Sequence, residues 1–282
     1  MQDSLERLSQ FLTDLGPAAV AVSGGVDSMT LAVLAHRVNK LIQMYHAVSP
    51  AVPRQATERI ERYSELEGWN LTVVDAGETS DPEYLANPAN RCYFCKTNLY
   101  DTIVTRTDSL VLSGTNLDDL DDYRPGLVAA KEHQVRHPYV ECEINKITLR
   151  QIAKQLGLDD LHDLPAAPCL SSRIETGIHI SPNILPVIND IEVAVREKLP
   201  AVENVRCRLR QTGIVLELDN SDTLDPVTLK HLENLMRENF KTTEFAKFAE
   251  HPEIHPYHKG SAFLRKNLAV DVTPPFEKQS EI

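Results

Sequence analysis

Two adjacent glycines form the segment with the clearest chemical potential. Gly24 and Gly25 lie within Ser23-Gly-Gly-Val-Asp-Ser28, after a short apolar run at 18–22 and before an amphipathic run at 28–37. The first run predicts a buried strand and the second a helix. Glycine lets a backbone turn tightly, and the free N–H groups at a helix start attract anions. The sequence therefore predicts a phosphate-binding loop, although it matches neither a Walker A loop nor G-x-G-x-x-G.

Cysteine spacing predicts a second chemical site. Cys92 and Cys95 form a Cys-x-x-Cys pair leading into a predicted helix, and Cys169 follows a proline in a polar loop. The pair is too late in its connection for a typical thioredoxin-like redox site. Zinc needs four ligands, so Cys142 or Cys207 would have to complete that site. An iron–sulfur cluster held by three thiolates keeps one iron open to another ligand.

The other candidate ligands have simpler interpretations. Cys207 alternates with Arg206 and Arg208, which predicts that its side chain points into a core. Nothing marks Cys142 beyond its two glutamate neighbours. The histidines near the end are interrupted by prolines that prevent a shared helical face, so we expect a solvated loop there: His251, His255 and His258.

The elements around these residues alternate in type. After an opening helix that stops at 16–17, strands are expected at 41–48, 71–74 and 109–113, and helices at 54–67 and 145–156. This order predicts an α/β fold with a doubly wound parallel sheet. Ligands bind at the carboxyl ends of such strands, so Ser49 and Gly114 should join the phosphate loop at one edge.

The pattern changes after Arg173. A helix is expected at 184–198, paired strands at 204–210 and 214–218, a second helix at 226–240 and a third strand at 243–248. We therefore predict two domains, at 1–175 and 176–250, followed by a loosely held tail at 251–282.

Composition narrows the classes of function. The net charge of −12 argues against a nucleic-acid-binding surface. The sequence has no apolar run of about 18 residues and no secretory pattern, so we expect a cytoplasmic protein without a membrane span. Five cysteines in such a compartment are not expected to form disulfides.

The phosphate loop resembles that of the PP-loop ATP pyrophosphatases. Four segments together resemble the narrower LarE family: Ser23-Gly-Gly-Val-Asp-Ser28, Asp122-Tyr-Arg-Pro-Gly-Leu127, Cys169-Leu-Ser-Ser-Arg173, and Val205-Arg-Cys-Arg208 with Glu217. The resemblance implies that ATP and Mg²⁺ adenylate a carboxylate of pyridinium-3,5-biscarboxylic acid mononucleotide, a nickel-pincer cofactor precursor. This adenylation releases pyrophosphate. Sulfur then displaces AMP.

The same resemblance implies roles for individual residues. ATP would be bound by Ser23, Gly24, Gly25, Asp27, Ser28, Ser49, Gly114 and Arg124, with Asp27 also reaching Mg²⁺. Arg206 and Arg208 would hold the substrate phosphate, although exposed strand arginines can equally form a solvated face. Glu217 would orient that pair, and a set of aspartates would bind metal or form a solvated loop: Asp118, Asp119, Asp121 and Asp122.

The sulfur source separates two LarE subtypes. One sacrifices a cysteine of its own, whose position corresponds to Pro168 here. The other holds a 4Fe-4S cluster through three cysteines, which match Cys92, Cys95 and Cys169. The resemblance therefore implies a cluster-dependent enzyme, catalytic residues Cys169, Asp27 and Glu217, a homo-oligomer, and a sulfide source or sulfur donor protein as partner.

Three other functions remain open from the residues. A cluster-dependent tRNA thiolase would share the ATP and cysteine residues but would bind tRNA. An ammonia-using PP-loop amide ligase would not need the three cysteines. An ATP-sensing or zinc-stabilised binding module would bind ATP without releasing AMP and pyrophosphate.

Overall fold

A parallel sheet lies at the centre of the first part of the chain. The computed structural model describes residues 2–121 and 124–262. The strands β1 (Ala18–Ala21), β2 (Gln43–Ala47), β3 (Leu71–Val74) and β4 (Leu110–Leu112) pair in the order β3-β2-β1-β4, all parallel. This is the α/β architecture that the alternation of strands and helices predicts.

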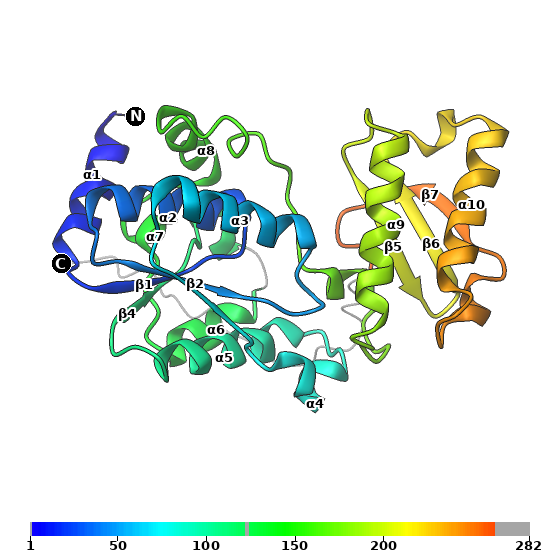
Figure 1. Ribbon diagram of the computed structural model, residues 1–282, viewed down its shortest axis with the longest axis horizontal. Coiled ribbons are helices and arrows are strands. Elements are labelled where there is room, and N and C mark those ends of the chain that lie inside the picture. Colours follow the sequence, from blue (N-terminus) through cyan, green and yellow to red (C-terminus); the bar gives the residue numbers. More distant parts are fainter. Residues whose placement is uncertain (1, 122–123, 263–282) are drawn as a thin grey trace.

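Helices cover both faces of this sheet (Figure 1). One core joins the sheet to α1 (Gln2–Asp14), α2 (Val26–Val38), α3 (Arg54–Glu67) and α8 (Lys146–Gln155). A second core on the other face joins it to α5 (Arg91–Val104) and α6 (Gly126–Glu132). Local signals set the helix ends: Gly68 ends α3 in the left-handed region at φ 69°, and the Asn145 side chain caps α8 by accepting from the Thr148 N–H.

Short elements connect the main ones. They are η1 (Glu78–Ser80), α4 (Pro82–Leu85), η2 (Leu117–Asp121), α7 (Pro138–Glu141) and η3 (Leu170–Arg173). Sequence periodicity predicts none of them because each is too short to show a repeating apolar face.

A three-stranded sheet follows η3. β5 (Val205–Arg210) and β6 (Gly213–Leu218) form an antiparallel hairpin, and β7 (Glu253–Pro256) pairs in parallel with β6. Helices α9 (Ile184–Lys198) and α10 (Pro226–Phe240) pack their apolar residues into the core of this sheet. In Figure 1 these elements lie to one side of the first sheet.

The expected third strand is wrong in position. Residues 243–248 form a turn and the start of η5 (Ala246–Ala249), and the strand lies instead at β7, within the expected tail. Pro252 precedes β7 and Pro256 is its last residue. Because β7 is an edge strand that pairs with β6 alone, the prolines remove no hydrogen bond from a central strand. His255 accordingly lies on a strand, half-exposed beside Glu253, rather than in a loop.

Candidate functional site

The phosphate loop connects β1 to α2, as its sequence predicts. Gly24 has a φ of +80°, and a Cβ there would lie 2.8 Å from the Ala56 backbone oxygen. Ser28 Oγ accepts the Ser23 N–H at 3.0 Å and lies 3.1 Å from Ser23 Oγ. No side chain caps α2 at Gly25, so the N–H groups of its first turn are open to an anion.

The loops after β2 and β4 meet the phosphate loop at the same edge of the sheet. A Cβ on Gly114 would lie 2.8 Å from the Ser28 nitrogen and 2.9 Å from the Asp27 carbonyl carbon. Ser49 is held in its own turn, where its Oγ accepts the Ala51 N–H at 3.2 Å. Gly114 therefore permits direct backbone packing against the phosphate loop, which any side chain would prevent.

Two cations flank the phosphate loop, and sequence reasoning missed both. Arg59 on α3 donates to the Gly24 carbonyl at 2.8 Å, and burial lowers the pKa of this guanidinium. Lys146 on α8 donates to both Asp27 carboxylate oxygens, at 2.5 and 2.6 Å. Asn116 approaches the same carboxylate at 3.4 Å. Asp27, the expected Mg²⁺ ligand, is thus ion-paired with a lysine.

The three expected cluster cysteines lie within electrostatic reach of one another. Burial raises the pKa of the Cys95 thiol to about 12, and the charge of Cys169 adds to this shift. Cys92 is exposed, but desolvation by the surrounding protein and the charge of Cys169 still raise its pKa, whereas Arg91, Lys96 and Arg124 oppose that shift. The Cys-x-x-Cys pair on α5 and the later cysteine are therefore neighbours, far apart as they are in sequence.

The chemistry of this donor set fits a thiolate-bound metal group, but the set is not closed around one. Among residues 2–121 and 124–262, no group of three or more His, Cys, Asp or Glu side chains stands in an arrangement that holds a metal ion. A metal group at Cys92, Cys95 and Cys169 would therefore require these residues to rearrange. The three thiols by themselves are one ligand fewer than a closed zinc site needs.

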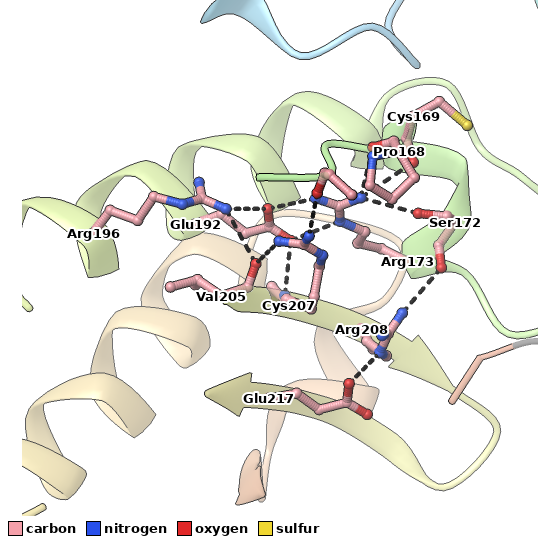
Figure 2. Close-up of polar contacts among 12 residues, drawn as sticks. Pro168, Cys169, Ser172, Arg173, Glu192, Arg196, Val205, Cys207, Arg208 and Glu217 are labelled. Atoms are coloured by element: carbon pink, nitrogen blue, oxygen red, sulfur yellow. Dashed lines mark hydrogen bonds and ion pairs between the residues drawn. The ribbon is translucent and has the colours of Figure 1, made fainter. Parts of the chain in front are cut away.

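A buried ion pair fixes the loop that carries Cys169 (Figure 2). Arg173 binds Glu192 of α9 through two hydrogen bonds of 2.8 Å, and both side chains are almost fully buried. The same guanidinium donates to the Pro168 carbonyl at 2.8 Å. Burial raises the pKa of Glu192, but the bonds and charge of Arg173 outweigh it and lower that pKa below its usual value. The Cys169 loop is thereby anchored to α9.

The expected substrate arginines are buried, so the solvated-face interpretation is wrong. Arg208 donates to Glu217 at 2.7 Å and to the Ser172 carbonyl at 3.1 Å. Arg206 donates to the carbonyls of Val205 and Ala166 at 2.8 and 2.9 Å. Burial and the neighbouring charge of Arg173 lower the pKa of Arg206 to about 10. No carboxylate of the described chain forms an ion pair with Arg206.

Glu217 is the centre of a second buried network. Besides Arg208 it accepts from Arg210 and, at 2.5 Å, from Ser261. Burial raises the pKa of Glu217, and these hydrogen bonds outweigh that effect, so its pKa is lowered. Glu217 bonds Arg208 across the paired strands, but among the described residues it forms no bond with Arg206, so its expected role toward both arginines stays a prediction.

Comparison with known proteins gives the family. No family model matches the sequence. An uncharacterized protein of Synechocystis sp., slr1717, is 39% identical over 223 residues, which cover 77% of this chain and 82% of the relative. The chain belongs to the slr1717 family. The similarity extends to protein MJ0830 of Methanocaldococcus jannaschii, 26% identical over 84% of the chain and 89% of that protein.

One relative of this slr1717-family chain has a functional name. It is the pyridinium-3,5-bisthiocarboxylic acid mononucleotide synthase of Lactiplantibacillus plantarum, 28% identical over 172 residues, or 59% of this chain and 62% of the relative. This match supports the resemblance to the LarE family.

The other two cysteines, Arg124 and two of the acidic residues of the slr1717-family chain contact other parts of the protein. Cys207 is fully buried in the core of the three-stranded sheet, as expected, and Cys142 is buried in the core that joins the first sheet to α1 and α2. Arg124 pairs with Asp119 at 2.7 Å. Asp118 accepts the Lys146 backbone N–H, so two of the four expected acidic residues bind protein groups. Asp122 lies outside the described residues.

No helix of the described chain is both long and apolar enough to cross a membrane.

Proposed function

We propose that this protein is an ATP-dependent sulfur transferase acting on a carboxylate of a small mononucleotide. The observation that carries the proposal is that Cys169 lies near enough to Cys92 and Cys95 to shift their pKa values, in a chain with an open phosphate loop. Similarity to a bisthiocarboxylic acid mononucleotide synthase supports the substrate, pyridinium-3,5-biscarboxylic acid mononucleotide. The products are AMP, pyrophosphate and a thiocarboxylate.

The phosphate loop binds ATP in this proposal. The α2 N–H groups and the Ser23 and Ser28 hydroxyls contact phosphate oxygens, while Asp27 reaches them through Mg²⁺. The substrate carboxylate attacks the α-phosphorus, the bond to pyrophosphate breaks, and the acyl adenylate forms. Because a carboxylate is a poor electrophile, this step supplies the leaving group that sulfur displaces.

The substrate phosphate binds near Arg206. Its guanidinium is buried and forms no ion pair with a carboxylate of the described chain, and burial and the charge of Arg173 lower its pKa. A bound phosphate supplies the negative charge that Arg206 lacks. Arg208, which is held by Glu217, provides a second hydrogen-bond donor. Arg173 and Glu192 hold the neighbouring Cys169 loop in position.

Cys92, Cys95 and Cys169 hold the sulfur-delivering group. A 4Fe-4S cluster held by these thiolates would supply the sulfide nucleophile. The nearby cations Lys96 and Arg124 compensate the negative charge that thiolates bring to this site. We expect a sulfide source or sulfur donor protein to replenish the sulfide.

Two measurements test this function. We expect wild type to release AMP and pyrophosphate only with the mononucleotide, and to give a thiocarboxylate by mass spectrometry when sulfide is present. After anaerobic purification, wild type should carry about four irons and four acid-labile sulfides per chain. Cys169→Ala should lose them, while Cys142→Ala, a buried thiol of the first core, should keep them.

Other results point elsewhere. If the purified protein contains zinc and no iron, the proposal of an iron–sulfur cluster is wrong. A loss of one sulfur from Cys169 during turnover would make that residue a sacrificial donor. Activity with ammonia that survives replacement of all three cysteines would favour an amide ligase. Binding of tRNA in a gel-shift assay would favour a tRNA thiolase.

A further inference from the structure

Lys146 is a cation at the phosphate loop to which the expected chemistry assigns no role. It is the first residue of α8, and its ammonium contacts both oxygens of Asp27 at 2.5 and 2.6 Å. The Lys146 and Asp27 side chains are 32% and 30% exposed, so the pair lies where a ligand from solvent can reach it. The segment 23–28 contains no lysine of its own, unlike a Walker A loop.

The backbone around Lys146 is fixed to the loop after β4. Its N–H donates to Asp118 at 3.1 Å, and the Leu117 N–H donates to the Ile144 carbonyl at 3.2 Å. Gly114 of that same loop packs against the backbone of Asp27. The start of α8 therefore has a set position relative to the phosphate loop, while the lysine stem keeps its rotatable bonds.

Lys146 and a divalent cation compete for one carboxylate. A lysine ammonium bonded to both Asp27 oxygens neutralises the carboxylate and takes one lone pair of each oxygen, so it weakens the binding of Mg²⁺ there. When Mg²⁺ arrives with a polyphosphate, it takes the carboxylate, and the displaced ammonium lies beside a newly bound polyanion. The electrostatically favourable position for the ammonium is then on the phosphate oxygens.

We propose that Lys146 is the phosphate-binding lysine of this site, supplied by α8 rather than by the loop itself. It pairs with Asp27 before the nucleotide binds and transfers to the β- and γ-phosphate oxygens when Mg²⁺ occupies Asp27. This inference rests on the proposed ATP chemistry, and it assigns Lys146 to the pyrophosphate part of the nucleotide rather than to AMP.

Calorimetric titration of wild type and Lys146→Ala tests the assignment, with α,β-methylene-ATP, pyrophosphate and AMP in the presence of Mg²⁺. We expect the dissociation constants of the ATP analogue and pyrophosphate to rise about 10- to 100-fold, the range for one hydrogen bond to a charged group. The AMP constant should change less than about twofold. Lys154→Ala removes an exposed charge from the same helix and should change none of them. Lys146→Met, which keeps the apolar stem, replaces the alanine variant if thermal melting shows a loss of fold.

Mn²⁺ binding without nucleotide tests the exchange at Asp27. Electron paramagnetic resonance should show several-fold tighter Mn²⁺ binding in Lys146→Ala than in wild type, and the gain should vanish in the double variant with Asp27→Asn. Analogue and Mn²⁺ affinities that are unchanged in Lys146→Ala would overturn the inference and leave the proposed function intact. A wild type that binds no ATP analogue would overturn both.

Discussion

Gly114 shows at the scale of one residue how the site depends on close backbone packing. The nearest atoms to a Cβ at this position are backbone atoms of Asp27 and Ser28, which cannot move aside as a side chain can. Gly25 differs, because a Cβ there would meet nothing closer than Ser23 Oγ at 3.8 Å. Gly25 therefore has room for a side chain and Gly114 does not, although the sequence assigns both glycines to ATP binding.

We predict that Gly114→Ala lowers the free energy of unfolding by about 1–3 kcal/mol, as overpacking does. Gly25→Ala should change it by less. Urea unfolding compares the two variants, and α,β-methylene-ATP titration should show weaker binding to Gly114→Ala because Asp27 and Ser28 are displaced. Equal stability of the two variants would contradict the close packing.

Glu192 gives a pH-dependent prediction. Its pKa in the folded chain is lowered from 4.5, so its carboxylate stabilises the fold fully above about pH 4.5, and this contribution is lost as the pH falls through the lowered pKa. Glu192→Gln leaves the buried Arg173 without a charge partner, and we expect a loss of about 3–5 kcal/mol at pH 7.

Urea unfolding across pH 3 to 7 measures this contribution. The difference between wild type and Glu192→Gln should narrow as the pH falls below about 4.5. Glu197→Gln, an exposed position on the same helix, should match wild type at every pH. A difference that stays constant with pH would mean that the charge of Glu192 does not stabilise the fold.

A signal for Glu192 was present in the sequence. It shares the apolar face of α9 with Ile188, Ile191 and Val195, and a carboxylate on such a face needs a buried partner. Lys146 gave no such signal, because a lysine at a helix start is ordinary and its partner Asp27 is distant in sequence. Residue roles that depend on contacts across the fold could not be read from spacing alone.

At the scale of elements, the sequence predicts the main strands and helices well. Predicted and observed bounds agree for α3 and β3, where Gly68 and the apolar run leave little choice. The third strand of the second sheet was misplaced because β7 is short, exposed and bounded by prolines. Its pairing with β6 is set by the tertiary fold rather than by its own side chains.

The cap of α8 carries an element-scale prediction. Asn145→Ala removes the acceptor for the Thr148 N–H and should lower the unfolding free energy by about 0.5–2 kcal/mol. Because Lys146 follows directly, the variant should also weaken pyrophosphate binding. Asn145→Ser keeps a capping oxygen and should restore both properties. Weak pyrophosphate binding in Asn145→Ser, with stability restored, would show that the cap does not act through Lys146.

At the scale of the whole molecule, the core of the three-stranded sheet crosses the predicted domain boundary. Ala51, Tyr84 and Leu170 precede residue 175 yet pack with the apolar residues of α9, β5 and β6. Tyr84 also hydrogen-bonds Ser171 at 2.5 Å, and Leu170 donates to the Ala51 carbonyl at 2.8 Å. The division at 175 remains a prediction, and the shared core favours coupled folding.

We therefore predict one cooperative unfolding transition. Trp69 is the single tryptophan and lies in the first core, so its fluorescence reports that part of the chain. Hydrogen exchange of β5 and β6 reports the second sheet. Both should change at the same urea concentration. Protected β5 and β6 amides after the fluorescence transition is complete would instead show two independently stable units.

The distance in sequence between the three neighbouring thiols has a consequence for biosynthesis. A ribosome releases Cys92 and Cys95 with α5 well before Cys169, and Glu192, which anchors the Cys169 loop through Arg173, emerges later still. The three thiols can therefore come together only after the chain has been made beyond Cys169, and their loop is anchored only after Glu192. Delivery of a metal group to these thiols would then be a maturation step on a folded chain, and the cell must keep the thiols reduced until it occurs.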